Sequence, residues 1–327
     1  MPAGQRLSAA CRLSISGADS AGPEGVDDAE ATGAASAGAQ SVAAAGETGN
    51  PPGVAGLDPA QIREVLTAGR LAITGRLTNA SNATLFGTVE LDGVELRCVH
   101  KPVAGERPLW DFPTGTLANR EVAAYEVSEA SGWRIVPPTV MREAQWGPGM
   151  CQLWIDTDED DALGDGGLLT LLPEDRADSA GWRPILSVEL EDGSPAVLAH
   201  KDDERLRRIA AFDVVINNAD RKGGHLLVGV REPDHVYGID HGVTFAVEDK
   251  LRTLLWGFAD EPLAAEVRET LEKLELDLAS GTLAERLGGL LDREEVDATR
   301  ERVRDLLRSA VLPGPDGRRR PVPWPPF

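Results

Sequence analysis

The chain has 327 residues, with 54 aspartates and glutamates against 33 lysines and arginines, which gives a net charge of −21. This length suffices for one large domain or two small ones with an ample core. The negative balance argues against electrostatic attraction to nucleic-acid backbones or anionic membrane surfaces. No stretch approaches about 18 consecutive apolar residues, and no apolar run typical of a secretory signal follows the first arginines, so we expect no membrane insertion.

The first 56 residues and the cysteines set two further expectations. Residues 1–56 are mostly Ala, Gly, Ser, Asp and Glu, and they cannot bury enough apolar surface to offset chain entropy, so we expect a disordered tail. Cys11, Cys98 and Cys151 lie far apart and form neither a disulfide framework nor a metal-ligand spacing. A reducing, cytoplasmic setting is the simplest interpretation.

Residues 57–155 are predicted to form a strand-rich N-terminal lobe. Asp58-Pro59 is a helix-start signal, and Asp92-Gly93 between alternating runs is a strong hairpin signal. The predicted elements are a helix over 59–68, strands over 71–77, 84–91 and 94–101, a helix over 117–130, and strands over 139–143 and 150–155.

Residues 156–312 are predicted to form a helical C-terminal lobe, which makes the fold class α+β with two lobes. An acidic loop over 156–165 opens it, and we interpret this loop as solvated surface. From about residue 168 the chain is predicted to be helical, with one helix running into Asn217-Asn218. Further helices are predicted near 263–278, 282–291 and 293–311, followed by a Pro-rich tail over 313–327.

Two aspartates flank a predicted hairpin inside this second lobe. Phosphoryl transfer requires a cation on the nucleotide phosphates, a lysine on the same phosphates, a carboxylate holding that lysine and another near the attacking hydroxyl. Lys101 ends a strand, and Glu121 follows on the next helix. Asp220 lies in a glycine-containing turn that exposes a carboxylate, and Asp240 ends a strand, where it could ligate Mg²⁺. Taken singly, each residue also fits an ordinary surface or turn position.

Around these residues the chain resembles a known group of proteins. The arrangement HKP…RE…NADRKGGH…IDHG is similar to the phosphatidylinositol 3-/4-kinase and HipA-like branch of atypical kinases. It is more similar still to an actinobacterial family of phosphatidylinositol-kinase-like proteins. The most specific phrases are SNATLFG, ERPLWDFPTGTLANRE and INNADRKGGH. The resemblance covers roughly residues 57–312. It implies a bilobal protein-kinase-like fold that binds ATP between its lobes and uses Mg²⁺ or Mn²⁺.

The resemblance also implies a role for each candidate. Lys101 would contact the α- and β-phosphates, and Glu121 would pair with it. Asp220 would be the catalytic aspartate, with Lys222 touching the γ-phosphate, and Asp240 would bind the metal.

Two segments would complete the nucleotide site. Residues 79–84, which include Asn79, Ser81 and Asn82, would cover the phosphates through their backbone N–H groups. The hinge would be formed by Gln152, Leu153 and Trp154, offering backbone groups to adenine.

One residue departs from the pattern of that branch. His225 stands where a metal-binding asparagine is expected, five residues after Asp220. Imidazole prefers transition metals to Mg²⁺. The metal preference therefore shifts toward Mn²⁺, or only one cation binds well, or activity is weakened.

The leading hypothesis is ATP-dependent phosphotransfer to an unidentified acceptor. A protein Ser/Thr hydroxyl is favoured over an inositol lipid, because no amphipathic helix rich in lysine and arginine is visible. One alternative is a pseudokinase that binds nucleotide or a partner without turnover. Another is a metal-dependent phosphohydrolase using His225, His235, Asp240 and His241, although His235 and Asp240 have opposite parity on their strand.

Overall fold

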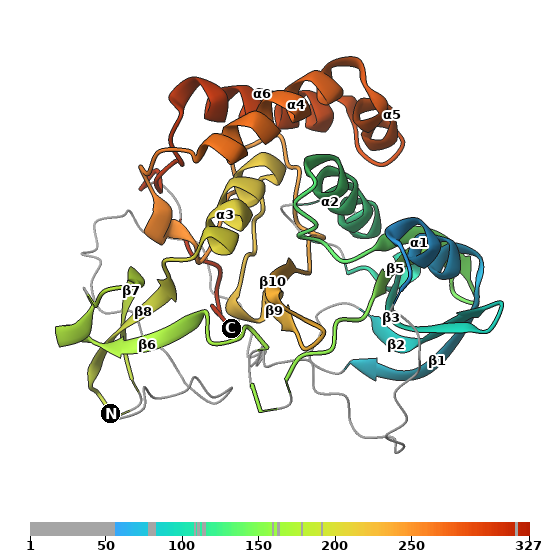
Figure 1. The fold of residues 1–327 in the computed structure, drawn as a ribbon, viewed down its shortest axis with the longest axis horizontal. Coiled ribbons are helices and arrows are strands. Elements are labelled where there is room, and N and C mark those ends of the chain that lie inside the picture. Colours follow the sequence, from blue (N-terminus) through green and yellow to red (C-terminus); the bar gives the residue numbers. More distant parts are fainter. Residues whose placement is uncertain are drawn as a thin grey trace, which may run out of the picture.

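A computed structural model describes residues 56–77, 83–107, 109, 112, 116–158, 160–161, 164–177, 179–190, 192–317 and 320–327. Figure 1 shows a strand-rich part and a part dominated by helices, which we name the N-terminal lobe (α1 to β5) and the C-terminal lobe (β6 to residue 327). The predicted α+β, two-lobed organisation is confirmed. The boundary at residues 155 and 156 stays a prediction.

The N-terminal lobe is a five-stranded antiparallel sheet with two helices. Its strands pair in the order β1-β2-β3-β5-β4. At the turn between β2 and β3, Asp92 and Gly93 both have positive φ, as a tight two-residue hairpin requires. The elements are α1 (Pro59–Ala68), β1 (Arg70–Leu77), β2 (Thr84–Leu91), β3 (Val94–Pro102), a 3₁₀ turn (Val103–Gly105), α2 (Leu117–Ser131), β4 (Thr139–Ala144) and β5 (Gly147–Leu153).

Helix α1 begins at a capping box, in which Asp58 accepts from the Gln61 N–H and the Gln61 side chain accepts from the Asp58 N–H. Its apolar face, with Val65 and Leu66, packs on the sheet. Helix α2 is different, because 11 of its 15 residues are buried. It contacts β4 and β5 on one side and α4 and α5 on the other, between the sheet and the helices (Figure 1). A helix enclosed in this way holds its polar side chains in fixed positions.

The C-terminal lobe begins with a three-stranded antiparallel sheet where the sequence was predicted to be helical, and that prediction is wrong for residues 169–201. The strands pair in the order β6-β8-β7. The apolar run of β8 is only a few residues long and is bounded by polar turns, which is typical of a buried strand. The bounds are β6 (Leu169–Pro173), a 3₁₀ turn (Glu174–Arg176), β7 (Trp182–Glu189) and β8 (Pro195–Lys201).

The remaining elements follow the predicted order. Helix α3 (Glu204–Ile216) is capped by the Asp203 side chain and ends at Asn217, which has φ +51°. A two-stranded hairpin then lies between Asp220 and Asp240. Its strands and the later elements are β9 (Leu226–Gly229), β10 (Glu232–Gly238), a 3₁₀ turn (Trp256–Phe258), α4 (Ala265–Ser280), α5 (Thr282–Gly288) and α6 (Arg293–Ser309). Within the described ranges, no helix combines the length and the apolar character that crossing a membrane requires.

Candidate functional site

Lys101 and Glu121 meet at the junction of the two lobes. Lys101 lies near the end of β3, which is fixed on both sides by pairing with β2 and β5. Its Nζ lies 2.7 Å from Oε1 of Glu121 on α2, and the Glu121 side chain is only 3% exposed. The second oxygen of Glu121 accepts a hydrogen bond of 2.9 Å from the backbone N–H of His241. One carboxylate therefore connects the sheet to the loop that follows β10.

Asp240 completes this cluster from the C-terminal lobe. Its Oδ1 pairs with the Lys101 ammonium, so that lysine lies between two carboxylates. Its backbone has φ +59°, a left-handed conformation that aspartate tolerates better than most residues. Its side chain is 45% exposed, which leaves the carboxylate accessible from solvent.

The three charges determine one another's ionisation. The neighbouring protein atoms keep part of the water away from Asp240 and so disfavour its ionised form, but Lys101 and His225 outweigh this and hold the pKa of Asp240 well below its usual range. Burial likewise opposes the charged lysine, but the two carboxylates raise the pKa of Lys101 above its ordinary value. Burial raises the pKa of Glu121, and the nearby ammonium only partly offsets this. Near neutral pH the lysine is a cation and Asp240 an anion.

The turn after α3 carries Asp220, Lys222 and His225. Asn218 shapes it, because its side-chain oxygen accepts from the Asp220 N–H at 3.0 Å. The Asp220 carboxylate, 32% exposed, lies 3.3 Å from the Lys222 ammonium. We name residues 220–225 the Asp220 loop.

His225 connects this loop to Asp240. Its Nε2 is 3.5 Å from Oδ2 of Asp240, and both Asp240 and Asp220 act electrostatically on its ring. Burial nevertheless lowers the pKa of His225, so the imidazole is neutral near pH 7. Its Nδ1 is buried and has no hydrogen-bond partner in the described part of the chain. Contacts therefore run from Glu121 to Lys101, from Lys101 to Asp240 and from Asp240 to His225. Asp220 lies close enough to act electrostatically on the His225 ring.

Arg221 is a residue that the sequence reasoning missed. It is fully buried and forms an ion pair of 2.8 Å with Asp213, which is also fully buried on α3. Its other donors reach the carbonyl oxygens of His225 and Ile239, and its Nη2 lies 2.7 Å from Nε2 of His241. Burial, reinforced by Arg221, holds the pKa of His241 well below its ordinary value, so this ring accepts from the guanidinium. Arg221 therefore joins α3, the Asp220 loop and the loop after β10.

A signal for this connection was present in the sequence. Asp213 lies among the apolar residues of α3 that face the core, and a buried carboxylate requires a partner. The first basic residue after the end of that helix is Arg221.

The proposed hinge residues have contacts of their own. The Gln152 side chain donates to Thr139, 2.9 Å away. The N–H groups of Leu153 and Trp154 already donate to backbone carbonyls within the N-terminal lobe, at 2.9 and 3.0 Å. Asn79, Ser81 and Asn82 lie outside the described residues.

His235 makes its contacts with residues outside the lysine cluster. Its Nε2 is 2.9 Å from the carbonyl oxygen of Arg134, and its ring packs against Tyr237. Across the described ranges, no group of three or more His, Cys, Asp or Glu side chains could hold a metal by itself.

Both ends of the acidic loop over 156–165 are hydrogen-bonded to the hairpin. Val230 donates to the Asp156 carbonyl at 2.8 Å, and Val228 donates to the Gly164 carbonyl at 2.7 Å. Asp165 is buried and accepts from two backbone N–H groups, and burial raises the pKa of its carboxyl to about 6. This end of the loop is therefore structural and not solvated.

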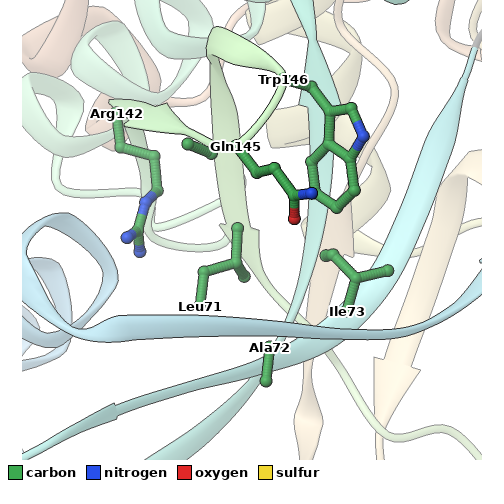
Figure 2. A pocket seen from close by; sticks show the side chains of 7 residues that line it. Leu71, Ala72, Ile73, Arg142, Gln145 and Trp146 are labelled. Atoms are coloured by element: carbon green, nitrogen blue, oxygen red, sulfur yellow. The ribbon is translucent and has the colours of Figure 1, made fainter.

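Two hollows in the described surface lie away from the lysine cluster. One, of about 550 Å³, lies between β1 and the turn joining β4 to β5, where Arg142, Gln145 and Trp146 surround it (Figure 2). The other, of about 1340 Å³, is lined by residues 247–252, α6 and the segment after α6. Neither is lined by Lys101, Asp220 or Asp240.

Comparisons with known proteins place the chain among relatives. No protein-family model matches it. Among solved structures, the golgi casein kinase is similar, with 14% identity and a TM-score of 0.47 over 77% of this chain and 74% of that one. The Helicobacter pylori proinflammatory kinase CtkA has 10% identity and a TM-score of 0.39, over 76% of this chain and 94% of that one. At these scores neither neighbour defines an activity for this chain.

A sequence relative gives a firmer assignment. Protein Rv2133c of Mycobacterium tuberculosis (strain ATCC 25618 / H37Rv) is 48% identical over 267 residues, which cover 80% of this chain and 94% of that protein. The phosphatidylinositol-kinase-like and HipA-like names remain interpretations of the sequence. The chain belongs to the family of protein Rv2133c.

Proposed function

We propose that this chain is an ATP-dependent phosphotransferase of the kinase type. The observation that carries the proposal is Lys101 held between Glu121 and Asp240, three residues from two lobes and three separate elements. A lysine fixed by one buried carboxylate and facing a second, accessible one is suited to receive phosphate oxygens while a cation binds beside it. In this proposal the ion pairs of Lys101 at the junction between the lobes hold the ammonium where the phosphates would bind.

Each side chain has a stated task in this proposal. Lys101 binds the α- and β-phosphates, and Glu121 holds the ammonium in place through the 2.7 Å contact. Asp220 accepts the proton of the attacking hydroxyl at its carboxylate oxygen. Lys222, 3.3 Å from that carboxylate, offers its positive charge to the γ-phosphate.

Asp240 and His225 would hold the divalent cation. They present one accessible carboxylate oxygen and one neutral imidazole nitrogen 3.5 Å apart, and this mixed oxygen and nitrogen pair fits Mn²⁺ better than Mg²⁺. When bound, the cation would neutralise charge on the β- and γ-phosphates. Because the low pKa of Asp240 keeps it ionised and the low pKa of His225 keeps it neutral, both donors are ready near neutral pH.

The proposal also includes the segments that would bind the rest of the nucleotide and the class of acceptor. Residues 79–84 as a phosphate cover and residues 152–154 as a hinge remain predictions. Since the N–H groups of Leu153 and Trp154 are used internally, a hinge there would offer adenine other backbone groups. We favour a protein Ser/Thr hydroxyl over a lipid as acceptor, because the net charge of −21 opposes anionic lipid surfaces. The proposed setting is cytoplasmic.

The test is transfer of labelled phosphate from ATP with Mg²⁺ or Mn²⁺, measured for the wild type, Asp220→Ala and Asp240→Ala. Each substitution should lower transfer by roughly 100-fold or more. Asp234→Asn, an exposed position on β10, is the matched control and should retain activity. Transfer that survives both substitutions at the site would contradict the assignment.

The transfer assay, together with the melting temperature measured with and without ATP, distinguishes an active kinase from the pseudokinase alternative. His225 in contact with Asp240 is the feature that favours it, because an imidazole at this position weakens Mg²⁺ binding. ATP that raises the melting temperature without any transfer would establish nucleotide binding without turnover. The phosphohydrolase alternative is not favoured, because His235 bonds to Arg134 and not to Asp240.

A further inference from the structure

The last described segment of the chain returns to the Asp220 loop. The carbonyl oxygen of Pro321 accepts from the Thr253 N–H at 3.2 Å and from the indole N–H of Trp256 at 2.8 Å. Val322 is buried in the main core. The Pro326 carbonyl then accepts a hydrogen bond of 2.9 Å from the backbone N–H of Gly223. In the view of Figure 1 this end of the chain lies between β6 and β9.

Gly223 is in tight contact with the ring of Phe327. A Cβ at this position would lie 2.5 Å from Cδ1 of Phe327, closer still to Cε1, and 3.1 Å from Leu169. The backbone of Gly223 is not left-handed, so glycine is not required there by its φ angle. It is required because an aromatic ring occupies the space of a side chain.

These contacts complete a set of backbone anchors on the Asp220 loop. Arg221 donates to the Arg252 carbonyl at 3.0 Å and accepts from the Leu254 N–H at 3.2 Å. Those bonds fix the loop directly after Asp220. The bond from Gly223 to Pro326 fixes it between Lys222 and His225. Without this bond, the backbone on which these two side chains stand has one anchor fewer.

We propose that residues 321–327 position the Asp220 loop, with Phe327 as the positioning residue that seats Gly223 and so fixes Lys222 and His225. The effect on turnover rests on the proposed phosphotransfer, but the seating of the loop does not. Phe327 contacts the loop at Gly223 and has no assigned role in holding the nucleotide. Its loss should therefore change the rate of the chemical step more than nucleotide binding.

The first test measures the loop directly by amide hydrogen exchange at Gly223 in the full chain. Phe327→Ala should accelerate exchange at this amide at least tenfold, about 1.4 kcal/mol of local opening. Trp324→Ala is the matched control, because this aromatic residue of the same segment is 44% exposed. It should leave the Gly223 rate unchanged. Equal rates in wild type and Phe327→Ala would overturn the proposal.

The second test separates positioning from general stability. Phe327→Ala should lower kcat about tenfold while the KM for ATP changes less than about twofold. Faster exchange with an unchanged kcat would overturn the positioning role. A wild type that transfers no phosphate would defeat the proposed function, and the exchange measurement would still decide whether residues 321–327 seat the loop.

A third test uses the steric contact. Gly223→Ala alone should accelerate exchange at the neighbouring amides of residues 222–225, because its methyl group displaces the ring. In the double variant with Phe327→Ala, Gly223→Ala should add little, since the ring is gone. Effects that simply add would show that the two residues act independently and would overturn the proposal. If Gly223→Ala does not fold, the exchange comparison of Phe327→Ala with Trp324→Ala decides alone.

Discussion

Replacing Lys101 by methionine removes the ammonium while keeping most of the side-chain volume. At the 2.7 Å separation from Glu121 the attraction is about 6 kcal/mol for an effective dielectric constant of about 20. Desolvation of both groups offsets much of it, and loss of one partner of a buried pair typically costs about 3–5 kcal/mol. The Lys101 side chain is 20% exposed, so we expect the free energy of unfolding to fall by about 3 kcal/mol. The contact with half-exposed Asp240 adds little, because water screens it.

The loss should depend on pH in a defined direction. Burial already raises the pKa of Glu121, and without the ammonium this pKa rises further. A carboxyl with a raised pKa stabilises the fold below its unfolded value of about 4.3, and that contribution is lost as the pH rises through the folded pKa. The deficit of Lys101→Met should therefore be larger at about pH 8 than at about pH 5.

Urea unfolding of Lys101→Met and of Lys101→Met/Glu121→Gln over this pH range provides the assay. The double variant removes the unpaired buried carboxylate of residue 121 and should regain at least about 1 kcal/mol at the higher pH. A pH-independent deficit, or a double variant less stable than Lys101→Met, would refute the reasoning.

Three further outcomes are expected. His225→Asn places an oxygen donor beside Asp240, so the ratio of Mn²⁺-supported to Mg²⁺-supported transfer should fall about tenfold; an unchanged ratio would exclude His225 from the metal site. Arg221→Met leaves the buried Asp213 carboxylate without its ion pair and should lower the free energy of unfolding in urea by about 3 kcal/mol; a loss below about 1 kcal/mol would contradict a structural role for this pair. Burial lowers the pKa of His200 to about 4, so protons favour the unfolded chain as the pH falls below about 6.5. Between those values the wild type should lose about 3 kcal/mol more than His200→Gln, and parallel pH profiles would show that His200 does not titrate on unfolding.

Much of the fold follows from local signals in the sequence. Asp58-Pro59 predicted the start of α1, and Asp92-Gly93 predicted the hairpin between β2 and β3; both are confirmed. These features depend on the conformational preferences of a few adjacent residues. The sheet over residues 169–201 escaped prediction because its apolar runs are too short to show whether they belong to a strand or to a buried helix.

The candidate site could be predicted only where the type of a residue and its place on a strand or helix indicate its chemical role. A lysine ending a strand and a glutamate on the next helix could be paired in advance, and the structure brings them together with Asp240. The contacts of Arg221 depend on how α3 packs against two loops, which no local pattern specifies. The seating of Gly223 by Phe327 joins segments about a hundred residues apart, and a glycine pair in the sequence reads equally well as a simple turn.

The bond between Gly223 and Pro326 also determines when the Asp220 loop can be completed during protein synthesis. Synthesis proceeds at about 5–20 residues per second, so residue 326 emerges about 5 to 20 s after residue 223. Throughout that interval the sheet that carries Lys101 can already be complete, whereas the N–H of Gly223 has no carbonyl to meet. A chain that has not yet reached residue 326 therefore has its lysine strand in place and its Asp220 loop without this anchor.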